Sequence, residues 1–294
     1  MSFVHLHTHS HYSLLDGLSK VPELVAKAKS LGMPALALTD HGVMYGSVEF
    51  YKEAVKAGIK PILGVEAYVA RNKHTDKRPG IDTRPYHLIL LAKNEIGYRN
   101  IIKLTTIAHV DGFYYKPRID HELLEKYSEG IICSSACLQG EIASHVLNGD
   151  MPKAEEVARW HVETFGEGNY FLEVQHHPTI KPQASLNRAI FGLAKKLNIP
   201  VIATCDSHYL NREDDYAQDV MLCIQTKKTL ADTDRMSYMG EDFSLRSPEE
   251  MREIWKDHPE VIENTLKLAE KCEIELEFGK TILPGYELPK KRGT

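Results

Sequence analysis

The stretch FVHLHTHSHYSLLDG, residues 3–17, sets the expectations for the whole chain. It places four histidines two residues apart: His5, His7, His9 and His11. Side chains two residues apart share one face of an extended strand, so these imidazoles would line one face. Imidazole is the commonest side-chain ligand for zinc and similar ions, and the carboxylate of Asp16 follows in the same segment. The stretch therefore favours a metal site over a His-rich strand that binds no metal.

The composition is that of an ordinary soluble globular protein. With 294 residues, 43% hydrophobic and 26% charged, the chain can form one large domain or two small ones, and a single α/β barrel fits. The net charge of −5 gives no global basic field, so any contact with nucleic acid must be local or supplied by metals. We find no signal sequence, no membrane-length apolar run and no CxxC motif, which predicts a reducing, cytoplasmic location.

Short apolar runs alternate with helical patterns up to Asp206. Strands are expected at 3–7, 35–40, 60–70, 86–92, 130–136, 169–175 and 200–206. Helices are expected at 21–32, 46–58, 95–109 and 183–198, with a mostly helical stretch leading to Phe165. This alternation predicts a mostly parallel sheet with helices outside it, whose apolar strands are covered on both faces.

Beyond Asp206 the pattern becomes helical and mixed in charge, without a strong strand. Ser247 followed by Pro248 is typical of a helix start, so a helix is expected over 247–258. The expected organisation is a barrel over 1–212, a helical extension over 213–280 and a linker over 281–294.

Metal-type side chains gather where the expected strands end. Five strands carry them at or near their ends: His7 and His9, Asp40 and His41, Glu66, Cys137, and Asp206 and His208. Catalytic groups of a barrel come from the carboxyl ends of several strands, so these side chains converge if the sheet closes. His87 stands instead at the start of its strand. Either that strand runs the other way or His87 is a core histidine.

A site with nitrogen, oxygen and sulfur ligands suits zinc, manganese or iron better than magnesium or calcium. The candidates outnumber the four ligands of one tetrahedral ion, which indicates two or three divalent ions. Neighbouring ions clamp the oxygens of a phosphoester and lower the pKa of bound water. The expected reaction is therefore hydrolysis, most simply of a phosphoester.

The motifs HTHS (7–10), TDHG (39–42), GVE (64–66) and CDSH (205–208) resemble the polymerase and histidinol phosphatase (PHP) family. Further passages, among them HSHYSLLDG, LGMPALALTDHG, AGIKPILGVEAYV, GFYYKPRID and GEDFSLRSPEEM, are similar to the PHP domain of the bacterial DNA polymerase III alpha subunit. The resemblance runs from one end of the chain to the other. It implies a distorted seven-stranded (β/α)7 TIM-like barrel, with the linker leading to a polymerase palm that this chain lacks.

The resemblance also implies a three-metal site and an activity. The implied ligands are His7, His9, Asp16, His41, Glu66, His87, Cys137, Asp206 and His208, and Asp16, Asp206 and His208 are the implied catalytic residues. The implied activity is a 3′–5′ exonuclease that proofreads for a DNA polymerase. The implied partners are a DNA 3′ end, the polymerase domains and other replisome subunits.

Other conspicuous residues have simpler interpretations. His5 and His11 are expected to pack or to support the ligands, and Asp40 to orient His41 or a neighbour. His176 and His177 are expected in a surface turn. Four residues are expected in the core: Cys133, Cys205, Trp160 and Trp255. The aromatic and basic loop 113–118 is either a stacking platform for single-stranded DNA or a loop packed on the barrel.

Two alternatives to the nuclease remain open. One is a small-molecule phosphatase of the same fold, which needs no groove for single-stranded DNA. The other is a catalytically silent barrel that supports the polymerase and uses its metals only for stability; the complete ligand set argues against it.

Overall fold

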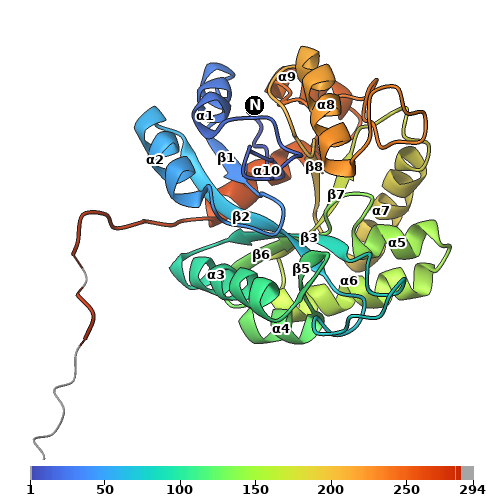
Figure 1. The fold of residues 1–294 in the computed structure, drawn as a ribbon, viewed down its shortest axis with the longest axis horizontal. Coiled ribbons are helices and arrows are strands. Elements are labelled where there is room, and N and C mark those ends of the chain that lie inside the picture. Colours follow the sequence, from blue (N-terminus) through green and yellow to red (C-terminus); the bar gives the residue numbers. More distant parts are fainter. Residues whose placement is uncertain (1, 282, 286–294) are drawn as a thin grey trace, which may run out of the picture.

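The computed structural model describes residues 2–281 and 283–285. Its centre is one mixed, curled sheet with the strand order β4-β5-β2-β3-β6-β7-β8, and β1 pairs with β2 (Figure 1). The strands are β1 (Ala35–Leu38), β2 (Lys60–Val69), β3 (Tyr86–Ala92), β4 (Phe113–Tyr114), β5 (Lys116–Ile119), β6 (Ile131–Ser134), β7 (Tyr170–Gln175) and β8 (Val201–Thr204). Six of the seven expected strands are confirmed, and the β4–β5 hairpin lies where the sequence predicts a loop.

Helices surround the sheet, as the alternation predicts (Figure 1). They are α1 (Val21–Ser30), α2 (Ser47–Ala57), α3 (Glu95–Val110), α4 (His121–Tyr127), α5 (Glu141–Leu147), α6 (Met151–Phe165), α7 (Gln183–Leu197), α8 (Asp215–Thr226), α9 (Pro248–Ile254) and α10 (Glu260–Lys271). Helix α9 begins as expected, because the Ser247 side chain accepts a hydrogen bond from the Glu250 backbone in a capping box. Within the described residues, no helix is long and apolar enough to span a membrane.

The expected first strand, 3–7, is wrong as a regular strand. The segment is extended, but its backbone bonds are divided between two neighbours, so it forms a continuous ladder with neither. Ala37 in β1 donates to the His5 carbonyl (2.9 Å), and Ser207 after β8 donates to the His7 carbonyl (3.2 Å). His9 in turn donates to the Ser207 carbonyl (2.8 Å). The segment therefore bridges the first and last parts of the sheet and brings residues 7–9 beside residues 206–208.

Most strand pairs are parallel, as expected, but the direction of β3 makes the sheet mixed. Four strand pairs are parallel, but β3 runs antiparallel to both of its neighbours, β2 and β6. The start of β3 consequently lies at the same edge as the ends of the parallel strands. Of the two interpretations of His87, the structure supports the reversed strand, which carries this residue to the edge where the other candidates gather.

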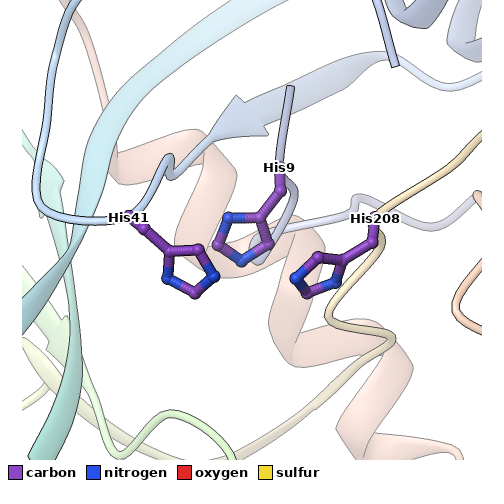
Figure 2. A group of neighbouring side chains, drawn as sticks. All are labelled: His9, His41 and His208. Atoms are coloured by element: carbon purple, nitrogen blue, oxygen red, sulfur yellow. The ribbon is translucent and has the colours of Figure 1, made fainter. Parts of the chain in front are cut away.

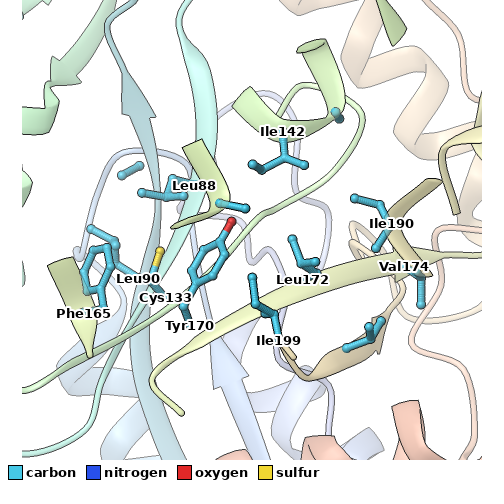
Figure 3. Packing of buried hydrophobic residues seen from close by; sticks show 14 of the residues in the cluster. Leu88, Leu90, Cys133, Ile142, Phe165, Tyr170, Leu172, Val174, Ile190 and Ile199 are labelled. Atoms are coloured by element: carbon cyan, nitrogen blue, oxygen red, sulfur yellow. The ribbon is translucent and has the colours of Figure 1, made fainter. Parts of the chain in front are cut away.

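A buried apolar cluster fills the space between the sheet and helices α3, α5, α6 and α7. Figure 3 shows part of it, including Leu90, Cys133 and Leu172, all of which are fully buried. Cys133 and Cys205 are buried core residues, as predicted, and so is Trp255. Trp160 is only partly buried and donates from its indole nitrogen to Glu125 (2.9 Å), so its assignment to the core is wrong.

Helix α10 packs against the curled sheet beside β8 and the N-terminal segment (Figure 1). The Thr265 hydroxyl accepts from the Val4 backbone (3.3 Å), and Leu268 shares a core cluster with Val4 and Leu6. This contact covers the segment that carries the first histidines. The expected boundary at residue 212 stays a prediction, and most of the expected linker over 281–294 lies outside the described residues.

Candidate metal centre

The structure brings all nine candidate ligands together at one edge of the curled sheet. They come from the N-terminal segment, the ends of β1, β2 and β8, the start of β3 and the loop after β6. Figure 2 shows the imidazoles of His9, His41 and His208 facing one another, with ring centroids 4.1 Å (His9–His41) and 4.3 Å (His9–His208) apart. Convergence of these side chains was the main expectation from the sequence, and the geometry confirms it. Whether they bind metals stays a prediction.

Glu66 lies at the centre of the group and is fully buried. Its carboxylate oxygens lie 2.6 Å from His41 Nδ1 and 2.7 Å from His87 Nδ1. They also lie 3.4 Å from His7 Nε2 and 3.3 Å from His9 Nε2. One carboxylate therefore faces four imidazoles, so Glu66 would hold metal ions together with these histidines.

Asp206 and Asp16 supply the other carboxylates. Asp206 Oδ1 lies 3.1 Å from both His7 Nε2 and His9 Nε2. Asp16 faces another pair of imidazoles, with Oδ2 3.0 Å from His41 Nε2 and Oδ1 3.7 Å from His208 Nε2. Each carboxylate thus faces at least two imidazole nitrogens at distances that a shared cation would also satisfy.

Cys137 completes the group from the loop after β6. Its Sγ lies 3.9 Å from His87 Nδ1 and 4.0 Å from Glu66 Oε1. Burial and the carboxylates of Asp206 and Glu66 raise the pKa of this thiol well above its usual value. Because a metal ligand must be a thiolate, Cys137 would join the site only when a cation offsets that negative charge.

Several histidines are oriented through their second ring nitrogen. His9 Nδ1 is 3.0 Å from Ser13 Oγ, and that hydroxyl donates to Asp40 (2.7 Å). His208 Nδ1 donates to the Asp206 carbonyl (2.7 Å). This leaves the Nε2 atoms of His9 and His208 aimed into the group, as in histidines that bind metal. Asp40 acts on a neighbour, as predicted, but through Ser13 rather than by touching the His41 side chain.

Sequence reasoning missed Glu173, in the middle of β7. It is buried, and its Oε2 lies 3.2 Å from His7 Nδ1 and accepts from the Thr204 hydroxyl (2.7 Å). Its position fixes the ring of His7 so that Nε2 faces Glu66 and Asp206. The available signal was a single carboxylate within the apolar run YFLEVQ, which has no reason to be buried unless it has partners.

The buried carboxylates and histidines of the group shift one another's pKa values. Burial alone would raise the pKa values of Glu66 and Asp206, but the surrounding histidines hold both well below the usual range. Burial likewise opposes protonation of His41, yet Glu66 and Asp16 raise its pKa to about 10. In contrast, burial and the neighbouring His41 and His208 lower the pKa of His9 to about 3. Without another cation, protonated histidines balance the buried carboxylates.

The residues fit divalent transition metals on two counts. Three buried polar atoms of the group make no hydrogen bond of good geometry in the described structure, although each lies within 3.4 Å of a carboxylate or imidazole atom of the group: His7 Nε2, His41 Nδ1 and Glu66 Oε2. Such atoms are rare in folded proteins unless water or an ion completes them. Moreover, ligand atoms within 4.8 Å of one another form three overlapping sets, namely His9, His41 and His208; His7, His9, Glu66 and Asp206; and His41, Glu66 and His87. Imidazole and carboxylate together favour zinc, manganese or iron.

Backbone strain accompanies the site. Leu15, Ala136 and Asp206 have φ values of 61°, 58° and 51°, in the left-handed region that non-glycine residues rarely adopt. Leu15 precedes Asp16, and Ala136 precedes Cys137. Strained positions persist where the surrounding structure enforces them, and here they aim three candidate ligands.

The group divides into a buried part and an open part. The buried part consists of His7, His9 and Glu66, which are fully buried. The open part faces a cavity of about 190 Å³. Six candidate ligands line this cavity, namely Asp16, His41, His87, Cys137, Asp206 and His208, and the other lining residues are Tyr68, Lys116, Gln139, Gln225, Met236 and Tyr238. The three residues with an implied catalytic role are therefore among those that a substrate could reach.

The remaining histidines stay outside the group. His5 is buried, and its Nε2 donates to the Arg246 carbonyl (2.8 Å), while His11 packs its ring against Tyr12. Both agree with a packing role. His176 is exposed, but His177 is buried and stacks on Phe243, so the expectation of a surface turn is wrong for His177.

Comparisons with known proteins identify a single family. A family model described as PHP domain matches residues 5–177. The chain is similar to DNA polymerase III subunit alpha of Borreliella burgdorferi, 47% identical over 99% of this chain and 26% of that protein. It is also similar to that of Treponema pallidum, 46% identical over 98% of this chain and 25% of that protein. The chain spans about a quarter of the length of these relatives.

Among solved structures, the chain is similar to a two-domain protein from Bacteroides vulgatus that contains a predicted PHP-like metal-dependent phosphoesterase. The two chains are 16% identical with a TM-score of 0.41, over 85% of this chain and 61% of the other.

Proposed function

Because this chain belongs to the PHP domain family, we propose that it is a metal-dependent phosphoesterase domain that removes nucleotides from the 3′ end of DNA. The similarity to DNA polymerase III alpha subunits supports a role beside polymerase domains in a cytoplasmic replication complex, where a 3′–5′ exonuclease would proofread. The observation that carries the proposal is the convergence of nine metal-type side chains beside an open cavity.

The nine side chains would hold two or three divalent ions. His7, His9 and Glu66 would anchor them from the buried side, and Asp16, Asp206 and His208 would complete the site from the cavity. Such ions supply charge stabilisation at the phosphoryl oxygens and lower the pKa of bound water towards 7.

The chain's own residues would then orient the attacking water. Asp16 is held as a carboxylate, because interactions with His208 and His41 outweigh burial and lower its pKa to about 2. It lies at the open side, 3.7 Å from His208. Asp16 would orient the attacking water at the open side, and the proton of that water would leave to solvent through the cavity. His208 would hold an ion through Nε2, because its Nδ1 already donates to the Asp206 carbonyl (2.7 Å), and solvent would protonate the oxygen that leaves on the shortened strand. Water adds to the phosphorus, the phosphorus–oxygen bond to that strand breaks, and a nucleotide monophosphate departs.

Two measurements test this proposal. Elemental analysis of protein purified without chelator should find two or three transition-metal ions per chain; one ion or none would contradict a shared cluster.

The second compares two conservative variants in 3′-end hydrolysis. Asp206→Asn keeps the shape but removes the negative charge that faces His7 and His9, so it should fold and lose nearly all activity. Asp40→Asn, which acts through Ser13, should lose less, about 10- to 100-fold. Parent-like hydrolysis by Asp206→Asn at matched metal content would show that the assignment is wrong.

A further inference from the structure

A second, larger cavity of about 580 Å³ adjoins the metal centre. Four residues line both cavities: Tyr68, His87, Lys116 and Gln139. The larger cavity extends from them between the loop over 71–85 and the end of α5. A ligand bound at the open side of the metal centre would therefore continue directly into this second cavity, which we call the cationic groove.

All the Asp, Glu, Lys and Arg side chains that line the cationic groove are basic. The lining includes Arg71, Arg84 and Lys116 and no aspartate or glutamate. None of these three cations forms an ion pair within the described residues. Arg71 and Lys116 instead make cation–π contacts with the rings of Tyr86 and Tyr68, respectively. In a chain of net charge −5, three unpaired cations around one groove leave a local site for anions.

The groove is held in shape before any ligand arrives. Arg71 donates from Nη1 to the Tyr86 hydroxyl (2.9 Å) and from Nε to the Arg84 carbonyl (3.0 Å). The fully buried Arg118 fixes the same loop by donating to the carbonyls of His74 (2.8 Å) and Asp82 (3.1 Å). Because the loop is already ordered in the free protein, binding costs little further conformational entropy, which favours affinity.

We propose that the cationic groove binds the phosphodiester backbone of the DNA strand next to the nucleotide being removed. This inference rests on the proposed function and adds the residues that recognise the strand. Its volume suits about one or two nucleotides, since pockets for ligands of that size span roughly 300–1,000 Å³. Arg84 and Lys116 contact phosphates on either side of the groove, and Arg71 stiffens its wall. A small-molecule phosphatase would have no use for such an extension.

The test uses the double variant Arg84→Ala/Lys116→Ala, because neither side chain makes a hydrogen bond within the described structure and both are exposed. The matched control is Lys73→Ala/Lys77→Ala, which removes two charges from the same loop outside the groove lining. The probe is a fluorescent hexathymidylate with phosphorothioate linkages, titrated by anisotropy at several salt concentrations.

The double variant should bind the probe on the order of 10-fold more weakly, and its slope of log affinity against log salt should be shallower by about 1.4, since each single-strand phosphate contact contributes roughly 0.7. The control should change both much less. Equal affinity and equal slope for parent and double variant, at matched metal content and melting temperature, would overturn the proposal.

A separate assay keeps the two claims apart. Parent hydrolysis of bis(p-nitrophenyl) phosphate tests the phosphoesterase itself, because this diester is too short to reach along the groove. Activity on the diester with no loss of DNA binding in the double variant overturns the groove and leaves the proposed function standing. Loss of DNA binding in the double variant supports the groove even when the parent proves inactive on the diester.

Discussion

Removing the metals should lower the melting temperature of the chain by about 10 °C or more. The buried centre holds the carboxylates of Glu66, Asp206 and Asp16 within 4 Å of several histidines. With ions bound, these groups are ligands; without them, histidines must be protonated in a buried site to balance the charge. Ions that bind only the folded state therefore stabilise it by mass action.

The magnitude follows from the binding equilibrium. One ion present at 1,000 times its dissociation constant contributes about 4 kcal/mol to the free energy of unfolding. For a chain of 294 residues, about 2.1 cal/mol/K of unfolding entropy per residue makes each kcal/mol shift the melting temperature by roughly 1.6 °C, so one ion accounts for about 6–7 °C. A second ion would add a comparable amount. Protonated His7 and His41 compensate part of the loss, which places the expected total for two ions at about 10 °C.

The assay is a melting curve by circular dichroism, before and after dialysis against chelator, with the residual metal measured. Zinc or manganese should restore the original curve. Magnesium is the control, because it prefers an all-oxygen octahedral site and should restore little. An unchanged melting temperature after verified removal of the metal would refute the account of a cluster that stabilises the fold.

Three further variants test other parts of the structure. Glu173→Gln should weaken metal binding about 10- to 100-fold in chelator competition, because it loosens His7, and a parent-like affinity would argue against that role. Burial lowers the pKa of His161 to about 4, so the folded state resists protonation of this side chain. The contribution of neutral His161 to the free energy of unfolding is therefore complete above pH 6.5 and falls as pH drops towards 4, by about 2 kcal/mol at pH 5. His161→Phe should remove that part of the acid sensitivity in denaturant titrations at pH 7.5 and pH 5, whereas an equal pH dependence would contradict it. Arg118→Met leaves buried carbonyls without donors, so it should lower the free energy of unfolding by about 3 kcal/mol and speed proteolysis within residues 71–85. If the variant resists proteolysis as well as the parent, Arg118 does not hold this loop in place.

Much of the site could be predicted because strand ends are visible in the sequence. Asp40-His41 and Asp206-x-His208 follow apolar runs directly, and any sheet that curls brings such ends together. The position of His87 could not be decided, because the direction of a strand depends on its neighbours and leaves no mark in YHLILLA. The antiparallel course of β3 supplies the answer.

Other features depend on tertiary contacts that local patterns do not encode. The segment over 3–7 has strand composition, yet it divides its hydrogen bonds between β1 and the residues after β8. Glu173 resembles an ordinary residue of an apolar strand until its contact with His7 is known. The cations of the groove are far apart in sequence, and only the closed loop over 71–85 brings Arg71 and Arg84 towards Lys116.

The most direct test of the central claim is digestion of a 5′-labelled primer with a mismatched 3′ end, by protein of measured metal content, followed at single-nucleotide resolution. The account predicts stepwise shortening from the 3′ end by metal-loaded protein, and none by chelated protein or by Asp206→Asn. An intact primer after prolonged incubation with protein that carries two or three ions per chain would contradict it.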